Sequence, residues 1–226
     1  AELHAAQILE VGMLPGAAVA EGLIPWPPPA IFNASTGLDS AEVLISLLSE
    51  LRGAAAPAGE RAAAGTAVLR AAEIGVDDGR TSERLLSRLP DLQLLLIDPY
   101  EFAGDSFFER EKVRSEEKAA GSLGTAWARL APFRNRGVLA CQRSSDAAAW
   151  VAPGALDLVF VDGDHAYDAV RQDLRTWREK LRPGGVLAGH DYSLFRPGVV
   201  QAVHEYALEV GALLHLGADA MWWLRF

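Results

Sequence analysis

The most constraining feature of this sequence is the regular alternation, from residue 66 onward, of short apolar runs with segments of helical periodicity. The run Leu92–Ile97 is almost wholly apolar, as expected of a strand that is covered on both faces. Strands that alternate with helices favour a parallel sheet with helices on both sides. We therefore predict an α/β fold built on a doubly wound sheet.

The pattern places the elements closely enough to locate the strand ends. Strands are expected at residues 67–74, 92–97, 137–141, 156–161, 185–188, 212–216 and 221–226. Helices are expected at residues 39–51, 81–89, 102–130, 167–181 and 199–210. Asp39 and Glu42 form a capping-box pattern at the start of the first of these helices. The last two strands are close enough in sequence to form an antiparallel hairpin, which gives seven strands in all.

The domain organisation follows from length and from proline content. A chain of 226 residues fits one large domain, which we place at residues 38–226. Residues 53–65 are rich in Ala, Gly and Pro and are predicted to be a surface insertion. Residues 1–11 could form a short helix, but the prolines at 25 and 27–29 prevent a longer one. We expect residues 1–37 to be a terminal arm or a lid over a site.

Charge and composition exclude several classes of protein. The net charge of −9 opposes a protein that mainly holds nucleic-acid backbones, although it allows a small nucleotide-like ligand. The single cysteine, Cys141, excludes a disulfide framework and is expected to be a small buried residue. No segment approaches the roughly 20 apolar residues of a membrane span. The first residues lack the basic and apolar regions of a signal peptide, so we expect a cytoplasmic protein without membrane or nucleic-acid partners. A homodimer is compatible with these features.

A glycine turn follows the first predicted strand of the alternating region. Gly75 and Gly79 permit a tight turn there, and the helix that begins near Ser82 offers its main-chain amides to an anion. Because ligands of such sheets bind at the carboxyl ends of the strands, this turn is a candidate binding site. The spacing differs from G-x-G-x-x-G, which lowers the case for a nicotinamide-dependent oxidoreductase.

The next strand ends also carry polar side chains. Asp98 stands some 20 positions beyond the glycine turn, where a carboxylate suits the hydroxyls of a ribose. The later strand ends carry the segments Ser144–Asp146, Asp162–His165 and Gly189–Tyr192. The last two of these are acidic, and carboxylates that meet without partners repel one another. A divalent cation with oxygen ligands would resolve that conflict.

Four segments, in order, resemble a known family. AAEIGVDDGRTSERLL, LLLIDPY, LVFVDGDHAYDAV and LRPGGVLAGHDY are similar to class I S-adenosylmethionine-dependent methyltransferases. The nearest branch is that of the metal-dependent small-molecule O-methyltransferases, which includes the catechol, caffeoyl-CoA and macrolide-sugar enzymes. The resemblance covers about residues 38–226. It implies a Rossmann-like sheet and transfer of a methyl group to a hydroxyl of a small molecule.

The resemblance also assigns roles to residues. Those implied to bind the cofactor are Glu73, Gly75, Ser82, Asp98, Ser145, Asp146 and Asp162. Gly75 is expected to leave no room for a side chain where the backbone meets the cofactor. The residues implied to hold Mg²⁺ or a similar cation are Asp162, His190 and Asp191. Relatives have an acidic residue where this chain has His190. If His190 is a ligand, it favours a softer metal such as Mn²⁺ or Fe²⁺.

His165 is the candidate general base. It stands three residues after Asp162, where catechol-type relatives carry a lysine and macrolide-sugar relatives a histidine. A cation lowers the pKa of a hydroxyl, and a base can then take its proton. The alternative role for His165 is a local hydrogen bond at a strand end.

Two other functions remain open from the sequence alone. One is a nicotinamide-dependent oxidoreductase on a similar sheet. The other is a catalytically degenerate, methyltransferase-like binding domain of a larger protein, although its intact acidic clusters oppose that interpretation. The sequence does not identify the methyl acceptor.

Overall fold

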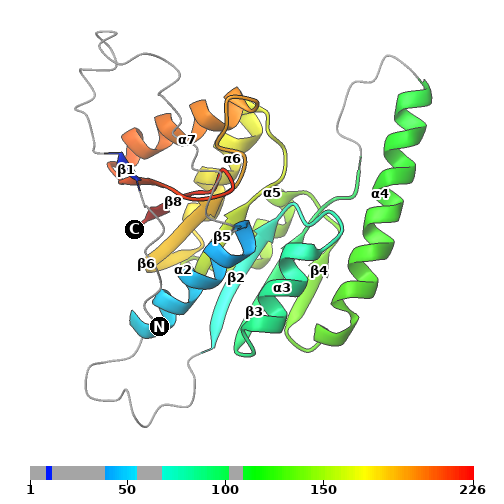
Figure 1. The fold of residues 1–226 in the computed structure, drawn as a ribbon, viewed down its shortest axis with the longest axis horizontal. Coiled ribbons are helices and arrows are strands. Elements are labelled where there is room, and N and C mark those ends of the chain that lie inside the picture. The colour runs from blue at the N-terminus through cyan, green and yellow to red at the C-terminus, as the bar shows by residue number, and fades with distance from the viewer. Residues whose placement is uncertain (1–8, 12–38, 55–67, 102–108) are drawn as a thin grey trace.

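A computed structural model describes residues 9–11, 39–54, 68–101 and 109–226, which form one sheet with helices on both faces (Figure 1). The strands are β1 (Leu9–Val11), β2 (Leu69–Ile74), β3 (Leu92–Ile97), β4 (Gly137–Ala140), β5 (Leu156–Val161), β6 (Leu181–Gly189), β7 (Leu214–Leu216) and β8 (Trp222–Arg225). The α-helices are α2 (Ser40–Ala54), α3 (Arg80–Arg88), α4 (Glu109–Leu130), α5 (Ser144–Ala147), α6 (Tyr167–Arg178) and α7 (Pro197–Val210). Two 3₁₀ helices are η1 (Ala131–Phe133) and η2 (Ala148–Trp150).

The strand order confirms the predicted doubly wound sheet. The order across the sheet is β1-β7-β8-β6-β5-β2-β3-β4, and the neighbours from β6 to β4 are parallel. β2 lies between β3 and β5, so the chain winds outward from it in both directions. Ligands of such sheets bind at this switch point, outside the carboxyl ends of the two central strands. The candidate residues at the ends of β2 and β5 therefore lie where a ligand is expected.

The C-terminal hairpin is present as predicted. β8 is antiparallel to both β6 and β7 and lies between them. β2–β8 account for the seven predicted strands, and β1 adds an eighth at the edge through pairing of Leu9 with Leu216. The short helix considered for residues 1–11 is therefore wrong at Leu9–Val11. The open edge of β7 offers unpaired main-chain groups there, and β1 pairs with them.

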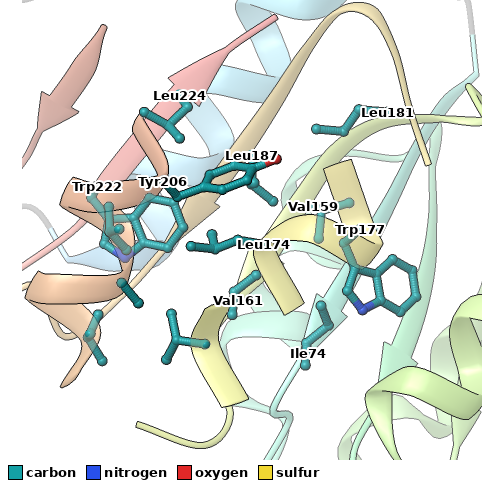
Figure 2. Close-up of a cluster of buried hydrophobic side chains, with 14 of the residues drawn as sticks. Ile74, Val159, Val161, Leu174, Trp177, Leu181, Leu187, Tyr206, Trp222 and Leu224 are labelled. Atoms are coloured by element: carbon teal, nitrogen blue, oxygen red, sulfur yellow. The ribbon is translucent and has the colours of Figure 1, made fainter. Parts of the chain in front are cut away.

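Two apolar cores hold the helices to the sheet. On one face, α6 and α7 bury Leu174, Trp177 and Tyr206 against β5, β6 and Trp222 (Figure 2). On the other face lie α2, α3 and α4, with these buried residues among others: Leu44, Leu48, Leu85, Leu86 and Ala126. Since both faces are covered, β5 is buried at all six positions, and five of them are apolar; the exception, Asp157, pairs with Arg182.

Some local details differ from the sequence expectations. Cys141 is exposed rather than buried, because β4 ends at Ala140 and Cys141 begins the loop that follows. Helix α2 continues past Gly53 to Ala54. The remaining arm at 1–8 and 12–37, and most of the predicted insertion at 53–65, lie outside the described residues.

Among the described residues, no helix is both long enough and apolar enough to cross a bilayer.

Candidate active site

The glycine turn at the end of β2 packs directly on the end of β5. Gly75 has a φ of +87°, and a Cβ there would lie 2.1 Å from the carbonyl oxygen of Asp162. The Asp162 amide also donates to the carbonyl of Ile74 at 2.7 Å. No residue with a side chain fits at position 75, but the space is filled by the chain itself. A substitution of Gly75 would therefore disturb the sheet as well as any ligand.

The Asp98 carboxylate holds this turn from the end of β3. Its Oδ2 accepts hydrogen bonds from the amides of Val76 (2.9 Å) and Asp77 (3.0 Å). Its Oδ1 accepts from the amide of Tyr100 at 2.8 Å, and the Tyr100 hydroxyl donates to the Asp77 carbonyl at 3.0 Å. The residue predicted to bind a ribose is thus part of a preformed cradle of main-chain donors.

Glu73 and Ser82 form a buried pair beneath the turn. The Ser82 hydroxyl donates to Glu73 Oε2 at 2.6 Å, and Glu73 is only 2% exposed. Burial raises the pKa of Glu73 to about 8, against the opposing effect of the Ser82 hydrogen bond. The nearby carboxylates Asp162 and Asp98 raise it further. The Ser82 hydroxyl already donates to Glu73. The predicted contact of Ser82 with a cofactor carboxylate would therefore have to come from the main-chain amide of Ser82.

Helix α5 brings Ser145 and Asp146 to the same edge of the sheet, and both are exposed. The neighbouring Ser144 fixes this helix from below. Its hydroxyl donates to Asp173 Oδ1 at 2.5 Å and accepts from the indole of Trp177 at 2.6 Å. Sequence reasoning missed this anchor, because nothing in the sequence links Ser144 to a helix some 30 residues later. Burial raises the pKa of Asp173 to about 6, opposed by the Ser144 hydrogen bond.

The second half of the site is a cluster at the ends of β5 and β6. Asp162, His165 and Asp191 each offer one ligand atom, and these atoms all lie within 4.8 Å of one another. His165 Nε2 lies 2.6 Å from Asp191 Oδ2. Burial raises the pKa of Asp162 to about 7; His190 opposes that shift, whereas Asp191 and Asp219 add to it. The surrounding residues thus compensate the negative charge of ionised Asp162 only in part.

His190 lies on the other side of the same two carboxylates. Its Nδ1 is 3.6 Å from Asp162 Oδ1 and 3.6 Å from Asp191 Oδ1. The left-handed backbone of Asp191, with a φ of +59°, leads into the next loop. Arg196 in that loop lies 3.8 Å from Asp191 Oδ2. The three predicted cation ligands and the predicted base therefore all lie together, with His165 and His190 facing different oxygens of Asp191.

One residue of this cluster was missed by the sequence reasoning. Asp219, in the turn between β7 and β8, lies 3.6 Å from His190 Nε2. It belongs to no motif, and only the pairing of β8 with β6 brings it to this edge of the sheet. A small pocket nearby is lined by residues that include Asp162, His165, His190 and Trp222.

Comparisons with known proteins give a match over the part of the chain that carries most of these residues. The model of a family described as a methyltransferase domain matches residues 72–192, more than half of the chain. That segment contains the glycine turn, Asp98 and the residues Asp162, His165, His190 and Asp191 of the cluster, but not Asp219. A search of curated proteins found no match to this sequence.

Solved structures share the fold at low sequence identity. The O-methyltransferase NovP superposes with a TM-score of 0.58 at 16% identity, over 82% of this chain and 78% of NovP. CalS11, a TDP-rhamnose 3'-O-methyltransferase of calicheamicin biosynthesis, gives 0.51 at 15% identity over 81% and 77% of the two chains. An rRNA methylase from Streptococcus thermophilus gives 0.51 at 14% identity over 81% and 93%. The fold is thus common to enzymes with different acceptors.

Proposed function

Since the chain belongs to the methyltransferase domain family, we propose that it methylates a hydroxyl of a small molecule with the help of a divalent cation. It is an S-adenosylmethionine-dependent methyltransferase, and the solved structures that share its fold include O-methyltransferases. The observation that carries the proposal is the contact between Gly75 and Asp162, which joins the glycine turn to the acidic cluster. A methyl donor at the first and an acceptor at the second would be neighbours.

The residues around the glycine turn fit the cofactor. S-adenosylmethionine supplies an electrophilic methyl group and carries a ribose, an ammonium and a carboxylate. The Asp98 carboxylate lies at the turn with both oxygens oriented by main-chain amides. The start of α3 offers main-chain amides to an anion. We assign the cofactor to Glu73, Gly75, Ser82 and Asp98, with Ser145, Asp146 and Asp162 along the adjoining strand ends.

The acidic cluster fits a divalent cation. Carboxylates and imidazoles are ligands for Mg²⁺, Mn²⁺ and Fe²⁺, and a cation would offset the burial, and the repulsion from Asp191, that raise the pKa of Asp162. When bound, such an ion lowers the pKa of an acceptor hydroxyl near it. We assign Asp162, His190 and Asp191 as its ligands. The imidazole in this set favours Mn²⁺ or Fe²⁺ relative to an all-carboxylate site.

We assign His165 to take the proton of the acceptor hydroxyl. Its Nε2 lies 2.6 Å from Asp191 Oδ2, and a proton held between these two atoms would leave the lone pair on Nδ1 free. A carboxylate behind an imidazole fixes the ring and stabilises the imidazolium that forms when it accepts a proton. The competing arrangement has His165 as a ligand, since it belongs to the group within 4.8 Å. If His165 is the base, His165→Ala should keep its affinity for the cation. If His165 is a ligand, the variant should lose that affinity.

The acceptor is proposed to be a small hydroxylated molecule. CalS11 is described as acting on TDP-rhamnose, which is such a molecule. The net charge of −9 opposes a large phosphate backbone as acceptor. We further propose that residues 38–226 form the catalytic domain, with residues 1–37 as an arm or lid that contributes to the acceptor site.

A methyl-transfer assay with labelled S-adenosylmethionine tests the proposal. We expect methylation of hydroxylated small molecules, with catechol and TDP-rhamnose as first probes, to stop on chelation and to return with Mg²⁺ or Mn²⁺. Calorimetry should show binding of S-adenosylmethionine and none of NAD⁺. Activity in excess chelator, with no metal found by elemental analysis, would contradict the cation's role. Methylation of ribosomal RNA alone would contradict the acceptor class.

A further inference from the structure

The main chain of His190 is fixed from both sides. Its amide donates to the Val161 carbonyl at 3.2 Å, and its carbonyl accepts from the Trp222 indole at 3.1 Å. The preceding Gly189 admits no side chain, because a Cβ there would lie 2.2 Å from the Trp222 ring. With the backbone held in this way, the rotation of the imidazole is the main freedom left to His190.

The two nitrogens of this imidazole face different groups. Nδ1 points between the Asp162 and Asp191 carboxylates, at 3.6 Å from an oxygen of each. Nε2 points to Asp219 Oδ2, also at 3.6 Å, and is buried without a hydrogen bond to any part of the chain that the structure describes. A separation of 3.6 Å is too long for a hydrogen bond, so a small rotation of the ring or the carboxylate is needed to form one.

Asp219 is itself held in position by two contacts. Its Oδ2 accepts from the amide of Ser40 at the start of α2, at 3.0 Å. The next residue, Ala220, accepts through its carbonyl from the amide of Tyr192 at 3.0 Å. The turn between β7 and β8 is thereby tied to the residue that follows Asp191. The carboxylate faces His190 because of the fold and does not depend on a flexible loop.

We propose that Asp219 is a positioning residue that holds the proton of His190 on Nε2 and so turns the Nδ1 lone pair toward the cation. The proposal rests on the proposed function, because it assumes a cation between Asp162 and Asp191. A neutral imidazole carries one proton, and the stronger acceptor decides which nitrogen bears it. Carboxylates that accept from a metal-bound histidine in this way raise the affinity for the metal, commonly by about 10–100-fold.

The test measures Mn²⁺ affinity by electron paramagnetic resonance, on full-length protein without cofactor or acceptor. Asp219→Asn keeps a side chain that tolerates the φ of +56° at this position and an oxygen that can still accept from Ser40. We expect it to bind Mn²⁺ several-fold more weakly than the wild type. Asp219→Ala, which offers no acceptor, should lose about 10–100-fold.

Asp39→Asn is the matched control. Asp39 also accepts a hydrogen bond at the start of α2, from the amide of Glu42 at 3.1 Å, so its substitution disturbs the same helix end. It should leave Mn²⁺ affinity unchanged. In a His190→Ala background, Asp219→Asn should cost less Mn²⁺ affinity than it does in the wild type, because only the direct effect of its charge on Asp162 then remains.

The ¹⁵N chemical shifts of His190 in the Mg²⁺-loaded protein give a second measurement. They should show Nε2 protonated in the wild type and a shifted tautomer in Asp219→Ala. If both Asp219 variants kept wild-type Mn²⁺ affinity and an unchanged His190 tautomer, the proposed role of Asp219 would be overturned, but the proposed cation site would not. An equal loss in Asp39→Asn would also overturn it, in favour of a structural effect of α2. Failure of the wild type to bind Mn²⁺ would overturn this proposal and the proposed cation site together.

Discussion

The glycine turn and the acidic cluster lie at the same edge of the sheet, yet they satisfy their charges in opposite ways. Asp98 accepts three main-chain hydrogen bonds, so its negative charge is compensated by the chain itself. Burial, with smaller contributions from Asp191 and Asp219 and against the opposing effect of His190, raises the pKa of Asp162 to about 7. The first region is complete as folded, whereas the second lacks positive charge.

This difference indicates separate roles for the glycine turn and the acidic cluster. A preformed cradle can bind its ligand without rearrangement, and its affinity should not depend on metal. A cluster of carboxylates and imidazoles with too little positive charge gains most from a cation. The catalytic power should therefore depend on the cluster, and the cofactor affinity on the turn. Gly75→Val cannot separate the two, because position 75 packs on Asp162.

The largest effect should come from His165→Ala. If His165 takes the acceptor proton, kcat should fall by about 10²–10⁴-fold, and the pH dependence of kcat should change because the imidazole no longer contributes to it. The affinities for S-adenosylmethionine and Mn²⁺ should stay within about twofold of the wild type. The measurement is a pH–rate profile together with calorimetry. Loss of Mn²⁺ binding would instead identify His165 as a ligand, and wild-type turnover would remove it from the mechanism.

A smaller effect is expected from Asp98→Asn. The amide nitrogen of Asn would face a main-chain donor that the carboxylate now accepts from, which costs about 1–3 kcal/mol for an unsatisfied group. We expect the dissociation constant of S-adenosylmethionine to rise about 10–100-fold, with no change for Mn²⁺. Calorimetric titrations of both ligands measure this. If Mn²⁺ affinity fell in parallel, the two regions would not be independent.

The smallest effect concerns pH and stability. Glu73 has a pKa raised from 4.5 to about 8, so its contribution to stability is present below about pH 4.5 and is lost as the pH rises toward 8. Glu73→Gln, which can still accept from Ser82, should reduce the fall in Tm between pH 5 and 8 by about 5 °C. Mn²⁺ should instead reduce the part of the fall in Tm that comes from Asp162. Thermal unfolding curves at several pH values test this, and an unchanged slope in Glu73→Gln would contradict it.

The sequence was sufficient to predict the sheet and to place most of the candidate site residues at one of its edges. Mostly apolar runs at β3 and β5 predicted strands covered on both faces, and Asp98 and Asp162 directly follow the ends of these strands. This succeeded because parallel strands bring their carboxyl ends to one edge whatever the loops between them do. The antiparallel hairpin was also predictable from the short gap between its strands.

The parts that were not predicted depend on contacts between distant segments. Asp219 reaches His190 only because β8 inserts beside β6, and the Ser144–Asp173 contact joins α5 to α6. Cys141 is exposed because β4 ends one residue before it, and the sequence pattern does not locate a strand end to a single residue. Local patterns carry no information on such contacts, whereas the three-dimensional arrangement does.

The most direct test of the division between the two regions is calorimetric titration of S-adenosylhomocysteine and of Mn²⁺ into wild type and Asp162→Asn. We expect metal-free wild type to bind S-adenosylhomocysteine as tightly as the Mn²⁺-loaded protein does. We expect Asp162→Asn to lose Mn²⁺ binding while retaining most of its affinity for the nucleoside. If removal of metal abolished S-adenosylhomocysteine binding, or if Asp162→Asn bound Mn²⁺ as the wild type does, the account would be contradicted.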